Sequence, residues 1–459
     1  MFRSIVNTFS NCFRIPELKS RILFTLGILF VCRLIAFIRI PGLDGEELQR
    51  FYKAMEAGDG GLLGLYAMFT GGAVFRCAVG ALGIMPYITA TIIVQLLTAV
   101  VPQLSKLARE EGGRAKIIQY GRYLTLIVCL VQGTAMTLGW ERPQALFNSD
   151  KIGNLVLYSD TFIWWYRFQT LMILTTGTML LMWLGEQITE RGIGNGVSLV
   201  ITIGILGDLP AAVNGLKDMF FAEGTEFHVG HGVALVLLLG GVIAGVIAIT
   251  QAQRKVPVQY AQRAVGRKIF GGSTSFLPLK VNFPGVMPVI FASAILMVPQ
   301  QVFLYFGRLT ELSFFSEIAR ALNQGSFTYL VVYSLLILFF SYFWVATQFN
   351  ELQIADDLKK NNGYIPGVRP GQATSDYLHN AMSRITLAGA VFLTVIAVIP
   401  IILQNSMKIP PTVTHFFGGT SVLITIGVML DTMRQVESHL MMRHYDGFLK
   451  KGRIRGRSS

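Results

Sequence analysis

The 459-residue chain has few charged residues. Asp, Glu, Lys and Arg together make up 14% of it, whereas apolar residues make up 52%. A soluble domain carries about a quarter charged residues. Apolar stretches of about 20 residues, the length that crosses a bilayer, recur along the sequence. The composition argues against an ordinary soluble protein and predicts an all-α polytopic membrane protein.

The sequence also lacks the motifs that carry catalysis or metal binding. It contains no HExxH, no P-loop and no cluster of histidines. The four cysteines, Cys12, Cys32, Cys77 and Cys129, are far apart and form no CxxC pair. We therefore expect neither an enzyme nor a bound metal or cofactor, and we interpret the cysteines as small core residues.

Ten apolar segments account for most of the chain. They fall at about 22–39, 77–101, 118–139, 162–184, 196–213, 232–250, 285–306, 328–347, 384–403 and 415–432. Lys and Arg are concentrated in alternate connecting loops, so the positive-inside rule predicts that both termini are cytosolic. The N-terminal half, 1–213, and the C-terminal half, 214–459, then each have five spans. An odd number of spans per half predicts two pseudo-symmetric halves of inverted topology.

Acidic residues are nearly absent from these segments. Asp431 and Glu186 lie at segment ends. Ion-coupled transporters usually keep an ionisable residue inside the bundle, so this scarcity weakens a transporter interpretation. Arg33 is the clear basic residue inside a segment, and we expect its side chain to snorkel to an interface.

One apolar stretch, LLGLYAMFTGGAVF at 62–75, is too short to span and is interrupted by Gly71-Gly72. A half-length helix at membrane depth is tolerated only where protein or a water-filled cavity surrounds it. The alternative is an interfacial helix that lies flat on the membrane.

Two predicted cytosolic loops are longer than simple connectors. The loop 251–282 carries six basic residues and no acid, and Val256, Val258 and Tyr260 alternate with other residues. This pattern predicts a projecting hairpin with a basic tip. The loop 348–384 contains YIPGVRPG, in which prolines and glycines make a stiff turn that presents Arg369. The tail 433–459 is also basic, which topology and attraction to the membrane surface explain.

Several long motifs closely resemble the SecY family, the central subunit of the bacterial protein-conducting translocon. They occur in the family's order and extend over essentially the whole chain. They are FTGGAVFRCAVGALGIMPYITATIIVQLL at 69–97, GEQITERGIGNGVSLVI at 185–201, KVNFPGVMPVIFASAI at 280–295, YIPGVRPG at 364–371 and FFGGTSVLI at 416–424.

The resemblance implies a pore, a plug and a lateral gate. The pore ring would be Ile84, Ile88, Val197, Ile201, Ile290 and Ile424, an apolar constriction that excludes water by dewetting. The plug would be the short helix near 62–75, with Leu62, Leu63, Leu65, Tyr66, Met68, Phe69, Gly71 and Gly72. The gate would open sideways into lipid, with Gln95, Gln132 and Asn282 as candidate polar partners across its seam.

The resemblance also implies partners. These are SecE and SecG in a heterotrimer, the SecA motor ATPase, the ribosome, unfolded secretory chains with their signal sequences, and membrane lipids. Contacts with the motor and ribosome would involve Arg254, Lys255, Arg263, Arg267, Lys268 and Arg369. The predicted function is protein export and membrane insertion across the bacterial cytoplasmic membrane. A secondary transporter with inverted repeats and a non-conducting scaffold stay as alternatives.

Overall fold

The structure is a computed structural model, and it describes residues 15–54, 67, 69–110, 112–143, 153, 155–158, 162–207, 209–221, 229–260, 263–265, 268–270, 274–310, 313–323, 326–407 and 420–451. The described part is mostly helical. Its helices are α2 (Pro16–Ile35), α3 (Gly45–Ala54), α5 (Met85–Val100), α6 (Pro102–Arg109), α7 (Gly113–Glu141), α9 (Ile163–Arg191), α10 (Gly196–Leu206), α11 (Leu209–Phe221), α12 (Val229–Gln251), α13 (Met287–Thr310), α14 (Ser313–Ala321), α15 (Phe327–Gln348), α16 (Glu351–Lys360), α17 (Gln372–Met407) and α19 (Thr420–Lys451).

Nine of the ten predicted apolar segments each overlap one of these helices, whereas 196–213 is divided between α10 and α11. By length and composition, four described helical stretches can cross a membrane: Gly113–Glu141, Ile163–Arg191, Phe327–Lys360 and Gln372–Ile399. Met85–Val100 and Pro102–Ala108 make a fifth if this pair, bent by 103°, counts as one span. Shorter apolar helices include Gly196–Leu206 and Met287–Leu296. The chain is thus a helical membrane protein, and the number of ten spans stays a prediction.

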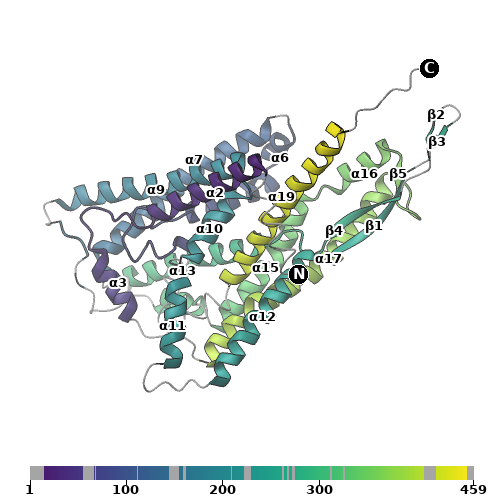
Figure 1. Cartoon of the computed structure of the whole chain (residues 1–459). Helices are drawn as coiled ribbons and strands as arrows, with labels where there is room; N and C mark the ends of the chain where they lie inside the picture. The colour runs from purple at the N-terminus through teal and green to yellow at the C-terminus, as the bar shows by residue number, and fades with distance from the viewer. Residues whose placement is uncertain are drawn as a thin grey trace.

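The helices form two groups that meet along α19. In Figure 1, α2, α7 and α9 lie on one side of α19, and α12, α15 and α17 lie on the other. Within the first group α5 packs on α7, α7 on α9 and α9 on α2; within the second, α13 packs on α15 and α15 on α17. The groups are joined where α5 meets α13 and where α10 meets α19. The predicted pore residues lie on these four helices.

The segment between the short apolar stretch and α5 is not helical, which corrects two predictions. Helix was expected to 75 and again from 77, but residues 71–84 form turns and α5 begins at Met85. Gly71, Gly72 and Gly83 have φ of +62°, +74° and +58°, a left-handed conformation that ends a right-handed helix. Pro86 in the first turn of α5 then suits a helix start.

These turns are fixed by backbone pairing with the chain that leaves α2. The Ile40 N–H donates to the Cys77 carbonyl at 2.9 Å, and the Val79 N–H donates to the Ile38 carbonyl at 2.8 Å. Ala73 and Cys77 are both fully buried. The segment is therefore irregular backbone enclosed by protein, as the hydrocarbon region requires.

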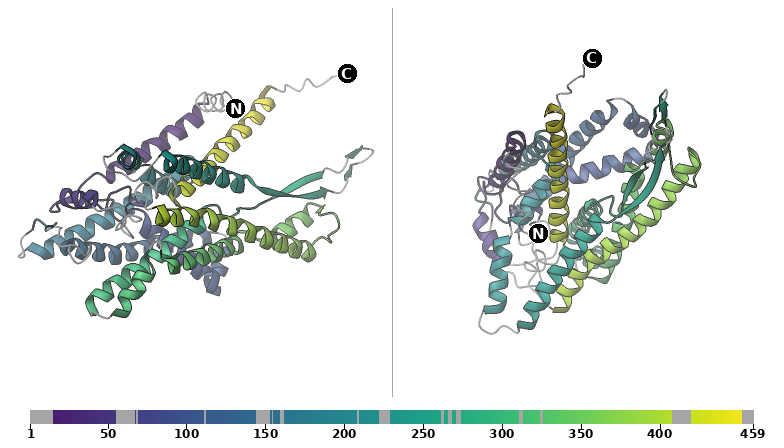
Figure 2. Two further views of the ribbon diagram at one scale, coloured as in Figure 1. Left: turned by 90° about the horizontal axis from the view of Figure 1, so that it is seen from below. Right: turned by 45° about the vertical axis from the view of Figure 1, so that its right-hand side comes forward.

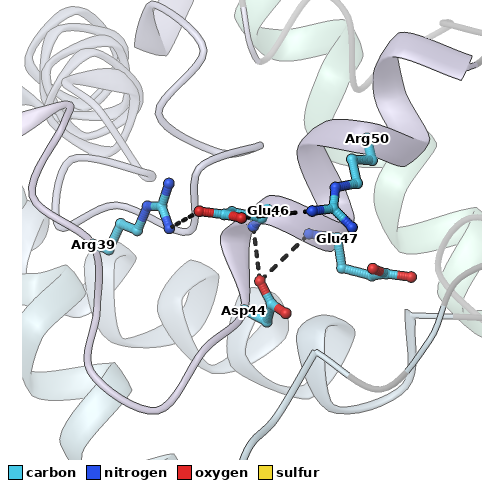
Figure 3. Close-up of polar contacts among 5 residues, drawn as sticks. All are labelled: Arg39, Asp44, Glu46, Glu47 and Arg50. Atoms are coloured by element: carbon cyan, nitrogen blue, oxygen red, sulfur yellow. Dashed lines mark hydrogen bonds and ion pairs between the residues drawn. The ribbon is translucent and has the colours of Figure 1, made fainter.

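A salt-bridged loop follows this pairing at the start of α3 (Figure 3). Asp44 Oδ1 accepts hydrogen bonds from the N–H groups of Glu46 at 2.9 Å and Glu47 at 3.4 Å, so it caps the helix. Arg39 Nη1 contacts Glu46 Oε1 at 3.0 Å. The cap at Asp44 thus fixes the start of α3 after the loop that leaves α2.

The predicted hairpin is present, and its strands fill the expected loop 251–282 almost from end to end. Its strands are β1 (Gln253–Tyr260), β2 (Arg263–Val265), β3 (Lys268–Phe270) and β4 (Thr274–Lys280). β1 pairs antiparallel with β4, and β2 with β3. Val256 and Val258 are buried while Lys255 and Pro257 are exposed, as the alternation predicts. Figure 2 shows the hairpin reaching beyond the ends of the helices.

Candidate pore, plug hinge and cytosolic surface

The predicted pore residues come from four helices and lie in one apolar cluster. Ile84 and Ile88 lie at and just inside the start of α5, and Val197 and Ile201 lie on one face of α10. Ile290 lies in the first turn of α13 and Ile424 in the first turns of α19. All are buried except Val197, which is partly buried against the same cluster. Their arrangement as a ring that closes a pore stays a prediction.

A polar cavity of about 380 Å³ lies beside this cluster, towards the hairpin. It lies between the N-terminal ends of α10 and α13 and the middle of α19. Asn195, Ser198, Lys280, Asp431, Arg434 and Gln435 are among its lining residues. Ser198 belongs to α10, one residue after Val197, so polar cavity and apolar cluster adjoin. A polar chamber next to an apolar constriction is an arrangement that suits an aqueous entry to a closed pore.

The described end of the plug is tightly packed rather than loosely hinged. Leu62, Leu63, Leu65, Tyr66 and Met68 lie outside the described residues, whereas Phe69, Gly71 and Gly72 are described. Phe69 is 4% exposed. Gly71 lies against α10, where a Cβ built on it would come within 3.1 Å of the Gly204 carbonyl oxygen. A small cavity of about 30 Å³, the space of one water molecule, adjoins Phe69 and Ile84.

The snorkelling predicted for Arg33 is wrong. Its Nη1 donates to the Gly71 carbonyl at 3.0 Å, and its Nη2 donates to the Gly207 carbonyl at 3.2 Å. The guanidinium therefore points into the protein, where it joins α2, the turn at Gly71 and the end of α10. Its acceptors are backbone atoms 38 and 174 residues away, which no side-chain pattern in the sequence reveals.

The three candidate gate residues lie on neighbouring elements. Among the described residues, no hydrogen bond joins any two of them. Gln95 is half-buried on α5 and Gln132 on α7, and these helices pack together. Gln132 Oε1 is buried without a hydrogen-bond partner among the described residues. Asn282 is 8% exposed in the turn that precedes α13. Their role as a gate stays a prediction.

The two loops predicted to be cytosolic form a single unit, which the sequence did not reveal. β5 (Gly363–Tyr364) pairs with the end of β1, so the sheet order is β4-β1-β5. Tyr364 also donates its hydroxyl to Gln259 Oε1 at 3.0 Å. Below the sheet, Val256, Val258, Ile365 and Leu378 share one buried cluster. The two-residue strand β5 is too short to give a periodic signal.

The basic residues predicted to bind partners are distributed over this unit. Arg254 and Lys255 are exposed on β1, and Arg263 and Lys268 lie on the tip strands β2 and β3. Arg267 lies outside the described residues. Arg369 is exposed, in a turn anchored by the buried Ile365 and by Thr374, whose hydroxyl donates to the Arg369 carbonyl at 2.9 Å. The exposed side chain is therefore presented from a fixed backbone.

Comparisons with known proteins agree with this arrangement. The SecY family model matches residues 78–433. The protein translocase subunit SecY of Chlamydia trachomatis is 40% identical over 460 residues, which cover 98% of this chain and 99% of that protein.

Two solved structures share the fold. One, described as "The structure of a protein conducting channel", is 17% identical with a TM-score of 0.59 and covers 95% of this chain and 94% of its own. The other is Sec61 in the canine ribosome-channel complex, 17% identical with a TM-score of 0.55 and the same coverage of both chains. By its family match and its full-length relative, the chain belongs to the SecY family.

Proposed function

We propose that this chain is the channel-forming subunit of a protein translocase. It passes unfolded secretory polypeptides out of the cytosol and releases membrane segments sideways into lipid. The observation that carries the proposal is the apolar cluster contributed by α5, α10, α13 and α19 beside a polar cavity. Isoleucine side chains can close such a path to water and ions and still move apart around a passing chain.

The proposed topology has ten spans in two inverted halves, 1–213 and 214–459, with both termini in the cytosol. The membrane is the bacterial cytoplasmic membrane. Two facts support this proposal. Lys and Arg are concentrated in alternate connecting loops, and α19 lies between two groups of helices.

In the closed channel, the segment 62–75 stoppers the pore from the outside, and the seam between α5 and α13 forms the lateral gate. Packing of Phe69 and Gly71 against α10 supports the plug assignment, because α10 also carries Val197 and Ile201. Gln95, Gln132 and Asn282 contribute weak polar contacts along the gate. Such contacts are worth about 1 kcal/mol in membranes, so a signal sequence can replace them.

The chain works within a larger complex and is not itself an enzyme. We assign SecE and SecG as partner subunits. The SecA motor or a translating ribosome supplies the energy for translocation, and both bind the surface formed by the hairpin and Arg369. The exposed basic side chains on β1 and the fixed turn at Arg369 support this assignment. Basic side chains that meet RNA phosphates bind with strong salt dependence.

Plug deletion with a conductance measurement tests the proposed function. Residues 69–84 are largely buried, so the deletion is limited to 62–68, closed by a short Gly-Ser linker. We expect an ion leak at least about tenfold above that of the full chain in planar bilayers, because the stopper is removed while the spans remain. An unchanged leak from well-folded protein would contradict a plugged channel. It would return a secondary transporter or a non-conducting scaffold as the better account.

A further inference from the structure

Arg33 lies where three separate parts of the first half meet. It belongs to the last turn of α2. Its guanidinium donates to the carbonyl of Gly71, in the described end of the plug segment, and to the carbonyl of Gly207, at the end of α10. The last carbonyls of a helix have no partner within the helix and carry partial negative charge. The Arg33 cation therefore provides a hydrogen-bond donor both to the carbonyl at the end of α10 and to the carbonyl of Gly71.

The fit around the guanidinium is close on both sides. A Cβ on Gly71 would lie 2.2 Å from Arg33 Nη1, and a Cβ on Gly207 would lie 2.3 Å from Arg33 Cζ. Phe37, one turn further along the chain, lies under two cations: Arg33 Cζ is 5.0 Å and Arg76 Cζ is 4.3 Å from the centre of its ring. Arg76 also contacts the Gly71 carbonyl, at 3.4 Å. We call Arg33, Phe37 and Arg76 the arginine clamp.

The clamp holds the point at which the plug leaves the wall of the bundle. Gly71 is the first residue of the turn that follows Phe69 and Thr70, and its φ of +62° sets the direction of the chain there. If the plug swings outward from the pore, the backbone at Gly71 must turn, and the bonds from Arg33 must lengthen or break. Since α10 carries two of the predicted pore residues, the same bonds tie the plug to the pore wall.

We propose that Arg33 is a positioning residue that keeps the plug closed and so sets how strictly the channel demands a functional signal sequence. This inference rests on the proposed function. A guanidinium suits the role because its planar fork can reach two carbonyls at once, whereas a lysine ammonium is a single point charge. The free energy that a signal sequence must supply to open the channel then includes the cost of breaking the two hydrogen bonds from Arg33.

The test approaches the clamp from both sides. Arg33→Gln removes the cation, and Gly207→Ala displaces the guanidinium without straining the backbone, because φ at Gly207 is −66°. We expect each variant to raise ion leak and the export of a protein with a defective signal sequence by about tenfold, the effect of losing one charged hydrogen bond. Arg33→Lys, which keeps the charge, should have an intermediate effect.

Two controls separate this role from general loosening of the fold. Gly27→Ala lies on the same helix, where a Cβ meets nothing within 4 Å, and should behave as wild type. The second control repeats Arg33→Gln in the chain that lacks 62–68. The part of the plug that would leave the pore is already deleted there, so no further increase should appear.

The outcomes are distinct. If deletion of 62–68 raises leak but Arg33→Gln and Gly207→Ala do not, the inference is wrong and the proposed function stands. If Arg33→Gln raises leak equally in the deleted chain, Arg33 only stabilises the bundle, and the inference is again wrong. If the deletion itself has no effect, the plug and the inference that rests on it both fail.

Discussion

At the scale of single residues, the proposed pore ring consists mostly of buried isoleucines. Ile290 is 1% exposed and Ile424 is fully buried, and both lie in the first turns of their helices. Burying an isoleucine side chain is worth about 1.5–3 kcal/mol. If these side chains close the pore, that free energy favours the closed state, because opening exposes them to water and to the passing chain.

Replacing Ile290 with Asn puts an amide into the apolar constriction. We expect export of proteins with defective signal sequences to rise about tenfold or more. The substitution removes apolar burial that stabilises the closed state and not the open state, so the channel opens more easily. Ile290→Val, which stays apolar, should change export little. Ile188→Asn, at an equally buried site on α9, controls for damage to the core. If Ile188→Asn relaxes export to the same extent, Ile290 is ordinary packing and the ring is wrong.

At the scale of elements, the sheet unit that we propose to be cytosolic combines two loops that are about 100 residues apart in the sequence. β5 pairs with β1 at Gln259 and Tyr260, and Ile365 and Leu378 pack under the sheet. Positive-inside topology requires only charge near the ends of the spans. It does not require a sheet that joins the loops or a fixed turn that presents Arg369. This construction is typical of a docking surface.

Arg369→Lys tests that surface while it conserves charge. We expect motor-driven export to fall about fivefold or more, because lysine cannot form the bidentate bonds that arginine makes with carboxylates or phosphates. Membrane topology should be unchanged. Arg21→Lys, at an exposed site near the start of α2, is the matched control. Wild-type export from both Arg369→Lys and Arg369→Glu would reduce the turn to a topology signal.

The positions of the apolar helices and of the hairpin could be predicted from sequence, because transfer free energy and strand alternation depend on local composition. The turns at 71–84 could not, since hydropathy does not register that Gly71, Gly72 and Gly83 adopt left-handed conformations. The clamp at Arg33 was missed because its acceptors are backbone carbonyls on other elements. The pairing of β5 with β1 was missed because two residues carry no periodicity.

At the scale of the whole molecule, the two groups of helices meet at contacts that include α5 with α13 and α10 with α19. Within the first group, bidentate ion pairs link the helices near both ends: Arg122 with Glu186, and Arg167 with Glu141. Pairs of this geometry help α7 and α9 to move as one body. The two groups of helices could therefore separate to open a polypeptide path between them while each group stays folded.

The central claim is that a secretory chain passes between these groups, through the predicted ring. Its most direct test is photo-crosslinking from Ile88 and Ile201, each replaced by a photoreactive amino acid, to a secretory chain stalled during export. Val131 and Leu335, which are 66% and 59% exposed on the apolar surface of α7 and α15, serve as control positions. A central channel predicts crosslinks to the stalled chain from Ile88 and Ile201 and lipid adducts from the controls. Equal crosslinking from all four positions, or none from Ile88 and Ile201 while the chain is stalled, would contradict it.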